Sequence, residues 1–403
     1  MSVLNGKKIL LGISGGIAAY KTASLVRLFI KAGAHVQVIM TPASKDFVTP
    51  LTLSTLSKNP VHSSFYNQDE ENEKWNNHVD LALWADLMVI APATANTLSK
   101  MANGTCDNLL LAVYLSAKCP VYFAPAMDLD MYKHPSSLAS FNSLQQYGNI
   151  IIPAESGELA SGLSGEGRMA EPENIVAFLE ADLESKLPLK GKKILITAGP
   201  TYEAIDPVRF IGNHSSGKMG FDIALSAANL GASVILVSGP TNCKVTNSLV
   251  EVIPVVSAQE MYDVCHHYYA DVDVAIAAAA VADYKPKIVS AQKIKKAADE
   301  FTIELEKTKD ILASLGANKK NQFLIGFALE TENEIENAKI KIQKKNLDLI
   351  VLNSLQDEGA GFGIDTNKVT FIDKEFHVEE MELKSKKAVA DDILNKVITH
   401  FYE

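Results

Sequence analysis

The amino-acid sequence predicts an α/β protein with two doubly wound, mainly parallel-sheet domains of Rossmann-like type in tandem. The pentapeptide GKKIL occurs at residues 6–10 and again at 191–195. Each copy leads into a glycine-bearing loop, an amphipathic helix and a second apolar strand. Apolar strands then alternate with helix-like stretches in both halves, which is typical of a parallel sheet covered on both faces. We therefore expect two separate active sites.

The strands and helices of the first half follow from this alternation. Its predicted strands are 8–13, 35–41, 87–92, 121–125 and 149–153, and its predicted helices are 17–32, 94–117, 132–147 and 172–185. Residues 155–171 are rich in Gly and Ser and have no period, so we expect a mobile flap that covers a site. Pro188 and Gly191 mark a boundary between domains 1–190 and 191–403.

The second half repeats the pattern and adds a hairpin. Its predicted strands are 193–198, 233–238, 273–279, 323–328 and 348–353, again separated by helices. Residues 368–373 and 376–383 alternate apolar with polar side chains, which predicts two antiparallel strands. An amphipathic helix over 386–403 closes the chain.

The bulk composition narrows the functional class. With 403 residues, of which 47% are hydrophobic, the chain can form two or three globular domains. It has no apolar run near the roughly 18 residues that span a bilayer and no signal-like N-terminus, so we expect a cytoplasmic protein without a membrane partner. The 4 cysteines lack CxxC spacing, which argues against disulfides and structural zinc. A net charge of -10 disfavours nucleic acid, so phosphorylated ligands must be held by local lysines, amides and helix N-termini.

The first glycine loop, GISGGIAAYK at 12–21, favours a phosphate group over a dinucleotide. Ser14 stands where the GxGxxG fingerprint has its second glycine, and strand 35–41 ends at Thr41 instead of an acid. NAD would therefore lack its ribose anchor. The Ser14 hydroxyl, the amides of Gly15 and Gly16 and the helix start beyond them suit a single phosphate.

Three further motifs are spaced to reach the same sheet edge: HVDLALWAD at 78–86, APATANTLSKMANG at 91–104 and APAMDLDMY at 124–132. With them the first half resembles the flavin-dependent cysteine decarboxylases. The whole chain is similar to the bifunctional phosphopantothenoylcysteine decarboxylase and phosphopantothenate-cysteine ligase family of coenzyme A biosynthesis. The resemblance implies FMN as cofactor and His78 as active-site base. The flavin contacts that it implies are Ser14, Gly15, Thr41, Thr94, Asn96 and Met127.

The implied decarboxylation explains why a flavin is needed. Loss of CO2 from an N-acylcysteine leaves a carbanion without an electron sink, unless the neighbouring thiol is first oxidised. A flavin can take up the hydride equivalent and return it after CO2 has left. An imidazole that titrates near neutral pH, such as His78, is suited to remove the thiol proton.

Two positions depart from the family pattern. The family's PxMNxxM asparagine, which holds the substrate carboxylate, is Asp128 here, and two facing carboxylates repel unless one is protonated or donors compensate. The family's proton-donating cysteine is Ser161, and a hydroxyl is a far weaker acid than a thiol of pKa about 8.5. Either this subgroup uses Asp128 and Ser161 with a proton path through Glu158 or Glu166, or the reaction stops at the oxidised enethiol and the domain is impaired or regulatory. A non-catalytic flavoprotein and an NAD-dependent reductase are the rival functions.

The most specific string of the chain is ITAGPTYEAIDPVRFIGNHSSGKMG at 196–220, which is far longer than a simple crossover needs. Its SSGK opens a helix and offers amides and a cation to phosphate. Together with AAAVADY (278–284), KIKK (293–296) and KNLDLIVLN (345–353), it resembles the ligase half of the same family. The resemblance implies that CTP activates 4'-phosphopantothenate as an acyl-cytidylate, which the cysteine amine then opens, with Mg2+ bearing phosphate charge.

The ligase residues are carried over from this resemblance. Asn213 would hold the acyl-cytidylate, Lys293 would supply the cation of the activation step, and Arg209 would lie beside the phosphopantothenate. Lys341 and Lys345 lie four apart, so one helical face could bring both to one triphosphate. No metal-ligating residue is identified, and self-association into a homo-oligomer is implied. The remaining CTP contacts that it implies are Ala279, Asp283, Lys309, Asp310, Ile311, Leu312 and Phe327.

Overall fold

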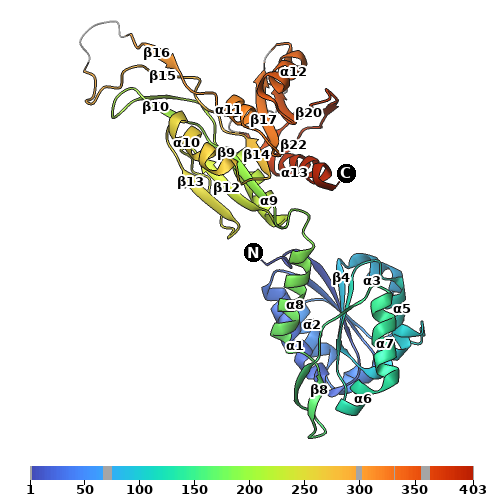
Figure 1. The fold of residues 1–403 in the computed structure, drawn as a ribbon. Helices are drawn as coiled ribbons and strands as arrows, with labels where there is room; N and C mark the ends of the chain where they lie inside the picture. Colours follow the sequence, from blue (N-terminus) through green and yellow to red (C-terminus); the bar gives the residue numbers. More distant parts are fainter. Residues whose placement is uncertain (1, 67–74, 296–301, 331, 355–363, 403) are drawn as a thin grey trace. The chain divides into compact units, whose positions relative to one another are not determined.

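The computed structural model describes all residues except 1, 67–74, 296–301, 331, 355–363 and 403. Contacts within the chain divide it into two compact units, Met1–Ser185 and Lys186–Glu403. Each unit is an α/β fold with helices on both faces of a largely parallel sheet (Figure 1). The predicted fold class is therefore confirmed.

The first unit is built on a six-stranded, all-parallel sheet. Its strand order is β3-β2-β1-β4-β5-β6, so the order reverses between β1 and β4. In doubly wound folds ligands bind at such a switch point, outside the carboxyl ends of the strands. The strands are β1 (Lys8–Ile13), β2 (His35–Met40), β3 (Val61–His62), β4 (Leu87–Ala93), β5 (Val121–Pro125) and β6 (Ile150–Ile151).

Helices cover both faces of this sheet (Figure 1). Buried side chains of α1 (Thr22–Lys31), α2 (Pro50–Ser57) and α8 (Pro172–Ser185) share one core with the sheet. A second core on the opposite face takes its helical side chains from α3, α4, α5 and α7. Those helices and the short elements are α3 (His78–Trp84), α4 (Ala95–Ala102), α5 (Leu109–Ser116), α6 (Leu129–Lys133), α7 (Pro135–Gln146), η1 (Ile17–Lys21) and η2 (Pro42–Asp46).

Three predictions for this unit were wrong in detail. The helix expected over 94–117 is two helices, because Gly104 has a positive φ of 69° and the Asn108 side chain caps a new helix start. The helix expected over 17–32 begins as the 3-10 turn η1. The segment 155–171 is not aperiodic: β7 (Glu155–Glu158) and β8 (Ser164–Arg168) form an antiparallel hairpin there.

The second unit has an eight-stranded mixed sheet of order β13-β12-β9-β14-β17-β18-β20-β21. The strands from β13 to β18 are parallel, and the expected hairpin is added antiparallel at one edge as β20 and β21. The strands of the sheet are β9 (Lys193–Ala198), β12 (Ser233–Ser238), β13 (Val250–Pro254), β14 (Val274–Ala277), β17 (Phe323–Glu330), β18 (Leu349–Ser354), β20 (Val369–Asp373) and β21 (Val378–Glu380).

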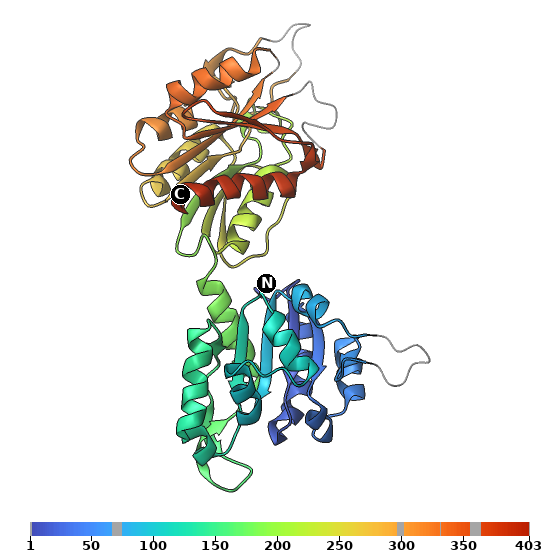
Figure 2. The same cartoon turned by 90° about the vertical axis from the view of Figure 1, so that its right-hand side faces the viewer.

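Two helices, α9 (Lys218–Asn229) and α13 (Lys386–Tyr402), share one core with this sheet, and Figure 2 shows α13 lying along the sheet. The opposite face is covered by α10 (Ala258–Tyr269), α11 (Ile311–Ala317) and α12 (Glu334–Lys345). Three short pairs stand outside the sheet. They are β10 (Tyr202–Ala204) with β11 (Phe210–Gly212), β15 (Tyr284–Pro286) with β16 (Leu305–Lys307), and β19 (Thr366–Asn367) with β22 (Lys384–Ser385).

The first helix of each unit ends at a glycine for the same physical reason. Gly33 follows α1 with φ +87°, and Gly231 follows α9 with φ +95°. Glycine adopts this left-handed conformation without the steric cost of a Cβ atom, so it ends the helix and turns the chain into the next strand. In the part of the chain that the structure describes, no helix has the length and apolar character required to cross a bilayer.

Gly220 sets the distance between α9 and β9. A Cβ atom at Gly220 would lie 2.5 Å from the Ala198 Cβ and 3.1 Å from its Cα. We expect Gly220→Ala to lower the free energy of unfolding of the second unit by about 1–3 kcal/mol, because the helix must move outward. Thermal unfolding followed by calorimetry measures this. Asn229→Ala, at the exposed end of the same helix, is the control and should change stability by less than about 0.5 kcal/mol. Equal stability of the two variants would contradict the proposed close packing.

Candidate active sites

The first unit has a cavity of about 1010 Å³ at the carboxyl edge of its sheet. Its walls come from the loops that follow β1, β2, β4 and β5 and from the β7–β8 hairpin. This is the switch point between β1 and β4, where a doubly wound fold binds its ligand. Of the residues predicted for the first site, those that line the cavity are Gly15, Thr41, Thr94, Asn96, Met127, Asp128 and Ser161.

Ser14 is not among the lining residues, because its hydroxyl is used inside the protein. Its Oγ donates to the Pro92 carbonyl oxygen at 2.6 Å and accepts from the Thr94 N–H at 3.0 Å, and the residue is fully buried. The neighbouring Gly15 does line the cavity, and its backbone lies so close to Ala43 that a Cβ would be 2.8 Å from the Ala43 Cβ. Ser14 thus fixes the loops that shape the cavity.

Several polar groups at the cavity lack a hydrogen-bond partner among the described residues. The Thr41 Oγ1 is buried and has no hydrogen-bond partner among the described residues. Thr94 precedes α4 without capping it through its side chain, and Asn96 in the first turn of α4 lines the cavity. A helix start with uncapped amides carries positive partial charge and suits a phosphate group. These features fit a phosphorylated ligand.

The β7–β8 hairpin closes one side of the cavity. The Met127 N–H donates to the Gly167 carbonyl oxygen at 3.0 Å, and a Cβ at Gly167, whose φ is +134°, would lie 2.4 Å from the Met127 carbonyl oxygen. The base of the hairpin is therefore fixed against the loop that follows β5. Ser161 lies at the exposed tip, between the two strands.

Asp128 is partly satisfied by the backbone. It is the N-cap residue of α6, and its Oδ1 accepts the Leu129 N–H at 2.7 Å. This contact is one donor of the kind that a carboxylate needs if it is to face another carboxylate. Arg168 also lines the cavity, and its guanidinium is paired with Glu171.

His78 is not among the residues that line this cavity. It is the first residue of α3, and its imidazole packs edge-on against the rings of Phe65 and Trp75, with centroid distances of 6.3 and 6.4 Å. Its Nδ1 is buried and has no hydrogen-bond partner among the described residues. The role of His78 as a base therefore stays a prediction that this arrangement does not support.

Among the cavity residues that sequence reasoning did not single out are Lys21, Asn108 and Lys100. Lys21 is 7% exposed, and its Nζ binds the Met169 carbonyl oxygen and Glu171, far along the chain. Asn108 caps the start of α5, and this position is a signal that the sequence pattern carries. Lys100 forms an ion pair with Asp107, and both residues line the cavity.

The second unit has a smaller cavity of about 180 Å³ at the carboxyl edge of its own sheet. It brings the start of α9, at Ser215–Met219, together with the segment that follows β14, the last part of β17, and single residues of β18, β19 and α13. Gly217 precedes α9 with φ +79° and provides no side-chain cap, so the first amides of that helix face the cavity region. Among the predicted ligase residues, Ala279 and Phe327 line this cavity.

Three cavity residues here were not predicted individually: Asn353, Asn367 and Lys386. Asn367 donates from Nδ2 to the Asn353 Oδ1 at 3.0 Å, and its own Oδ1 is buried without a partner among the described residues. Lys386 is 6% exposed, and burial lowers its pKa. Lys218 pairs with Asp365 at 2.5 Å, and this contact raises the pKa of Lys218. The cavity therefore has two lysines and a free amide oxygen.

The remaining predicted ligase residues are not among the residues that line this cavity. Asn213 donates from Nδ2 to the carbonyl oxygens of Ala280 and Val281 at 3.0 and 3.3 Å, which docks the long 199–217 loop beside Ala279. The Asp283 carbonyl oxygen accepts the Thr308 N–H at 3.0 Å, so this segment adjoins Lys309–Leu312 at the start of α11. Lys293 is exposed, and Lys296 of the KIKK motif lies outside the described residues.

The two lysines of α12 are each paired with a carboxylate. Lys345 binds Asp310, the N-cap residue of α11, with 2.9 Å between Nζ and Oδ2. Lys341 binds Glu330 at the end of β17. Lys309 places its Nζ 4.6 Å from the centroid of the Tyr262 ring. Neither α12 lysine lines the cavity, so the expectation that both reach one triphosphate has no support in this arrangement.

Comparison with known proteins agrees with two domains of different kinds. A family model described as "Flavoprotein" matches residues 2–184, and one described as "DNA/pantothenate metabolism flavoprotein C-terminal domain" matches residues 189–401. The bifunctional coenzyme A biosynthesis protein CoaBC of Bacillus subtilis (strain 168) is 46% identical over 397 residues, which is 98% of this chain and 97% of the relative.

Two further matches are informative. A "Cysteine/Cysteine sulfinic acid decarboxylase" from an unknown prokaryotic organism is 54% identical over 357 residues, or 87% of this chain and 99% of that protein. The solved C-terminal domain of a CoaBC protein is 47% identical and covers 54% of this chain and 98% of its own, with a TM-score of 0.46.

The bridging hydroxyl of Ser14 can be tested directly. Ser14→Ala removes the acceptor of the Thr94 N–H and one of the two donors to the Pro92 carbonyl oxygen, which costs about 1–3 kcal/mol and loosens the loops around the first cavity. We expect the dissociation constant for FMN, measured by flavin fluorescence, to rise about 10-fold or more. Ser140→Ala removes a similarly buried hydroxyl from α7, outside the cavity lining, and should leave that constant unchanged. Equal FMN affinities in both variants would contradict the bridging role.

Proposed function

This chain belongs to the CoaBC family of bifunctional coenzyme A biosynthesis proteins, and we propose that its two domains divide the family's two reactions between them. The protein is a bifunctional enzyme with ligase and decarboxylase steps in that pathway. One observation carries the division: each unit has its own cavity at the carboxyl edge of its own sheet. Residues 191–403 are the ligase domain, and residues 1–190 are the decarboxylase domain.

The ligase domain joins cysteine to 4'-phosphopantothenate. A carboxylate resists attack by an amine, so it first attacks the α-phosphate of CTP, which releases pyrophosphate and leaves an acyl-cytidylate. The cysteine amine then displaces cytidine monophosphate and forms the amide. Negative charge develops on the phosphate in the first step, and Mg2+ that arrives with CTP shares it with the protein cations.

Residues at the carboxyl edge support this assignment. The amides at the start of α9 together with Lys218 and Lys386 form an anion site beside Ala279 and Phe327. Asn213 is docked on the neighbouring backbone and holds the acyl-cytidylate, while Lys293 supplies the cation of the activation step. The exposed position of Lys293 leaves its ammonium group accessible to substrate.

The decarboxylase domain removes CO2 from the ligase product. It belongs to the flavoprotein family, and we assign FMN as its cofactor. The residues of the first cavity fit FMN: the phosphate would meet the amides near Gly15 and the start of α4, and Thr41 offers an unused buried hydroxyl. When bound, FMN supplies temporary uptake of a hydride equivalent from the substrate thiol carbon.

The chain's own residues must then orient the substrate and move protons. Asp128 faces the cavity from a helix start, with one oxygen held by a backbone N–H, so it orients the substrate carboxylate through shared donors such as Arg168. Ser161, at the tip of the hairpin, returns the final proton; both it and Glu158 line the cavity, which supports this assignment. The hairpin excludes water when it covers the substrate.

A second candidate substrate is free cysteine. The relative with 54% identity is named a cysteine/cysteine sulfinic acid decarboxylase. Free cysteine carries the same thiol and carboxylate on adjacent carbons as the N-acylcysteine, so the same chemistry applies to it. Cysteine sulfinic acid has no thiol and would need another route. Release of CO2 from cysteine alone, without CTP, would support this candidate.

The two-step function is tested by incubating the pure protein with 4'-phosphopantothenate, cysteine, CTP and Mg2+ and weighing the product by mass spectrometry. We expect 4'-phosphopantetheine, which differs from the ligation product by loss of CO2 alone. A product that lacks CO2 and two further hydrogens would mean that Ser161 cannot finish the reaction. Ser161→Cys is the matched variant: because a thiol is the stronger acid, it should convert such a product to the full one. A colourless preparation that does not consume CTP would overturn the assignment altogether.

The ligase assignment is tested with Lys293→Gln. We expect the variant to lose ligation by at least about 100-fold, because the phosphate charge of the activation step is no longer neutralised, while flavin absorbance stays unchanged. Lys295→Gln, an equally exposed lysine two residues away, is the matched control and should ligate at the normal rate. Asn213→Asp adds negative charge near the phosphate and should let the acyl-cytidylate accumulate, as mass spectrometry can detect. Normal ligation by Lys293→Gln would reject the assignment.

A further inference from the structure

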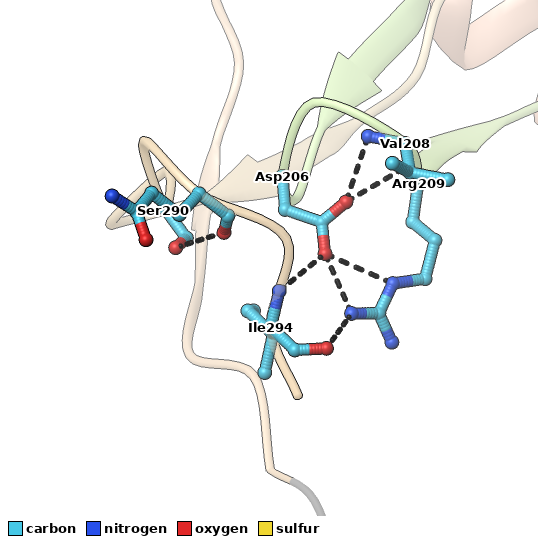
Figure 3. A network of polar contacts seen from close by, with 6 residues as sticks. Asp206, Val208, Arg209, Ser290 and Ile294 are labelled. Atoms are coloured by element: carbon cyan, nitrogen blue, oxygen red, sulfur yellow. Dashed lines mark hydrogen bonds and ion pairs between the residues drawn. The ribbon is translucent and has the colours of Figure 1, made fainter. Parts of the chain in front are cut away.

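The turn between β10 and β11 holds the backbone of one residue, Ile294, in the segment that carries Lys293 (Figure 3). Asp206 Oδ2 accepts the Ile294 N–H at 3.1 Å, and Arg209 Nη2 donates to the Ile294 carbonyl oxygen at 2.9 Å. Both backbone polar groups of Ile294 are therefore bound by side chains of a turn that lies 85 or more residues earlier in the chain. The Ser290 N–H also donates to the Ile205 carbonyl oxygen, at 3.0 Å.

Asp206 is the centre of this contact. Its side chain is fully buried and accepts five hydrogen bonds: Oδ1 takes the N–H groups of Val208 and Arg209, and Oδ2 takes the N–H of Ile294 and two from the Arg209 guanidinium (Figure 3). The Arg209 guanidinium and the backbone donors hold the pKa of Asp206 well below its usual range. The carboxylate stays ionised and cannot itself touch substrate, because it is buried.

Lys293 stands directly beside this contact. Residues 291–293 and 295 are exposed, whereas Ser290 and Ile294 on either side are half-buried and bonded to the turn. The Ser290 Oγ also donates to the Gln292 carbonyl oxygen at 2.6 Å, which restrains the backbone between Ser290 and Lys293 further. An exposed loop without such anchors would lose much conformational entropy each time its lysine had to meet a phosphate.

We propose that Asp206, acting with Arg209, is a positioning residue for Lys293 in the activation step of the ligase. The pair fixes the Ile294 peptide and so holds the backbone of Lys293 where its ammonium group can meet the phosphate of CTP. The proposal rests on the role proposed above for Lys293. It also gives Arg209 a task in addition to substrate binding, because its Nε and Nη2 are engaged with Asp206 and Ile294.

The test variant is Asp206→Asn in the full-length protein. If the asparagine Oδ1 still accepts the Val208 and Arg209 N–H groups, its NH2 group takes the place of Oδ2. That NH2 group then faces the Ile294 N–H and the Arg209 guanidinium, which are also donors, so these hydrogen bonds are lost. The pyrophosphate burst is measured with 4'-phosphopantothenate, CTP and Mg2+ but without cysteine. We expect its rate constant to fall about 10- to 100-fold, because Lys293 is displaced, while the CTP concentration for half-maximal burst changes less than twofold. The Ile294 amide should exchange hydrogen at least about 10-fold faster.

The matched control is Glu304→Gln. This variant removes the negative charge of the Lys287–Glu304 ion pair, which does not include Ile294. It should leave the burst rate constant and the hydrogen exchange of the Ile294 amide unchanged. Circular dichroism checks that the fold is retained. If Asp206→Asn does not fold, Ile294→Pro replaces it, because it removes the N–H that Asp206 binds; it also fixes φ of residue 294 and restricts the backbone of Lys293. The same fall in burst rate is then expected.

Lys293→Gln, measured in parallel, separates failure of this proposal from failure of the proposed function. A slow Lys293→Gln with a normal burst rate in Asp206→Asn would overturn the positioning role alone. A normal Lys293→Gln would overturn the role of Lys293 and, with it, this proposal. Unchanged hydrogen exchange at Ile294 in Asp206→Asn would show that Asp206 does not hold this peptide and would also overturn it.

Discussion

Both domains depend on one constraint: the loops that leave two adjacent central strands must be held at a fixed distance, because the ligand binds between them. In the flavoprotein domain, the Ser14 hydroxyl joins the loop after β1 to the loop after β4. In the second domain, Thr201 Oγ1 accepts the Ala282 N–H at 3.0 Å and joins the loops after β9 and β14. Both hydroxyls are fully buried, so each bridge is protected from water. A residue that resembles a ligand contact in the sequence can therefore act by shaping the site.

The lysines at the two cavities matter because the protein as a whole is negatively charged. A protein with a net charge of -10 must attract anionic substrates through local groups alone. Lys100 and Lys218, which line the two cavities, are paired with Asp107 and Asp365. Exposed ion pairs of this kind contribute little to stability, so a phosphate can compete for the lysine at small cost. The pairs hold the ammonium groups near the sites until substrate arrives.

The structure shows the surroundings of Asp128 and Ser161, the two residues that depart from the family pattern. Asp128 is a helix N-cap, and an acidic side chain is favourable at that position. Ser161 lies on the turn of a hairpin whose base is fixed through Met127 and Gly167, so its hydroxyl is carried by an ordered element. His78, in contrast, lies in an aromatic cluster with Phe65 and Trp75 outside the cavity lining. Proton transfer is thus the part of the decarboxylation that is least defined by one chain.

The sequence by itself determined the two α/β domains, the central strands and the glycines that end α1 and α9, because these follow from local hydrophobic periodicity and from backbone conformations that only glycine adopts at low cost. Most of the residues that it predicted for the first site do line the first cavity, because they lie in motifs at the carboxyl ends of the strands. Only the tertiary structure decided the inward bond of Ser14, the separate partners of Lys341 and Lys345, the buried Lys386 and the binding of Ile294 by Asp206. Most of these depend on contacts between distant parts of the chain, and no local pattern encodes which distant groups will meet.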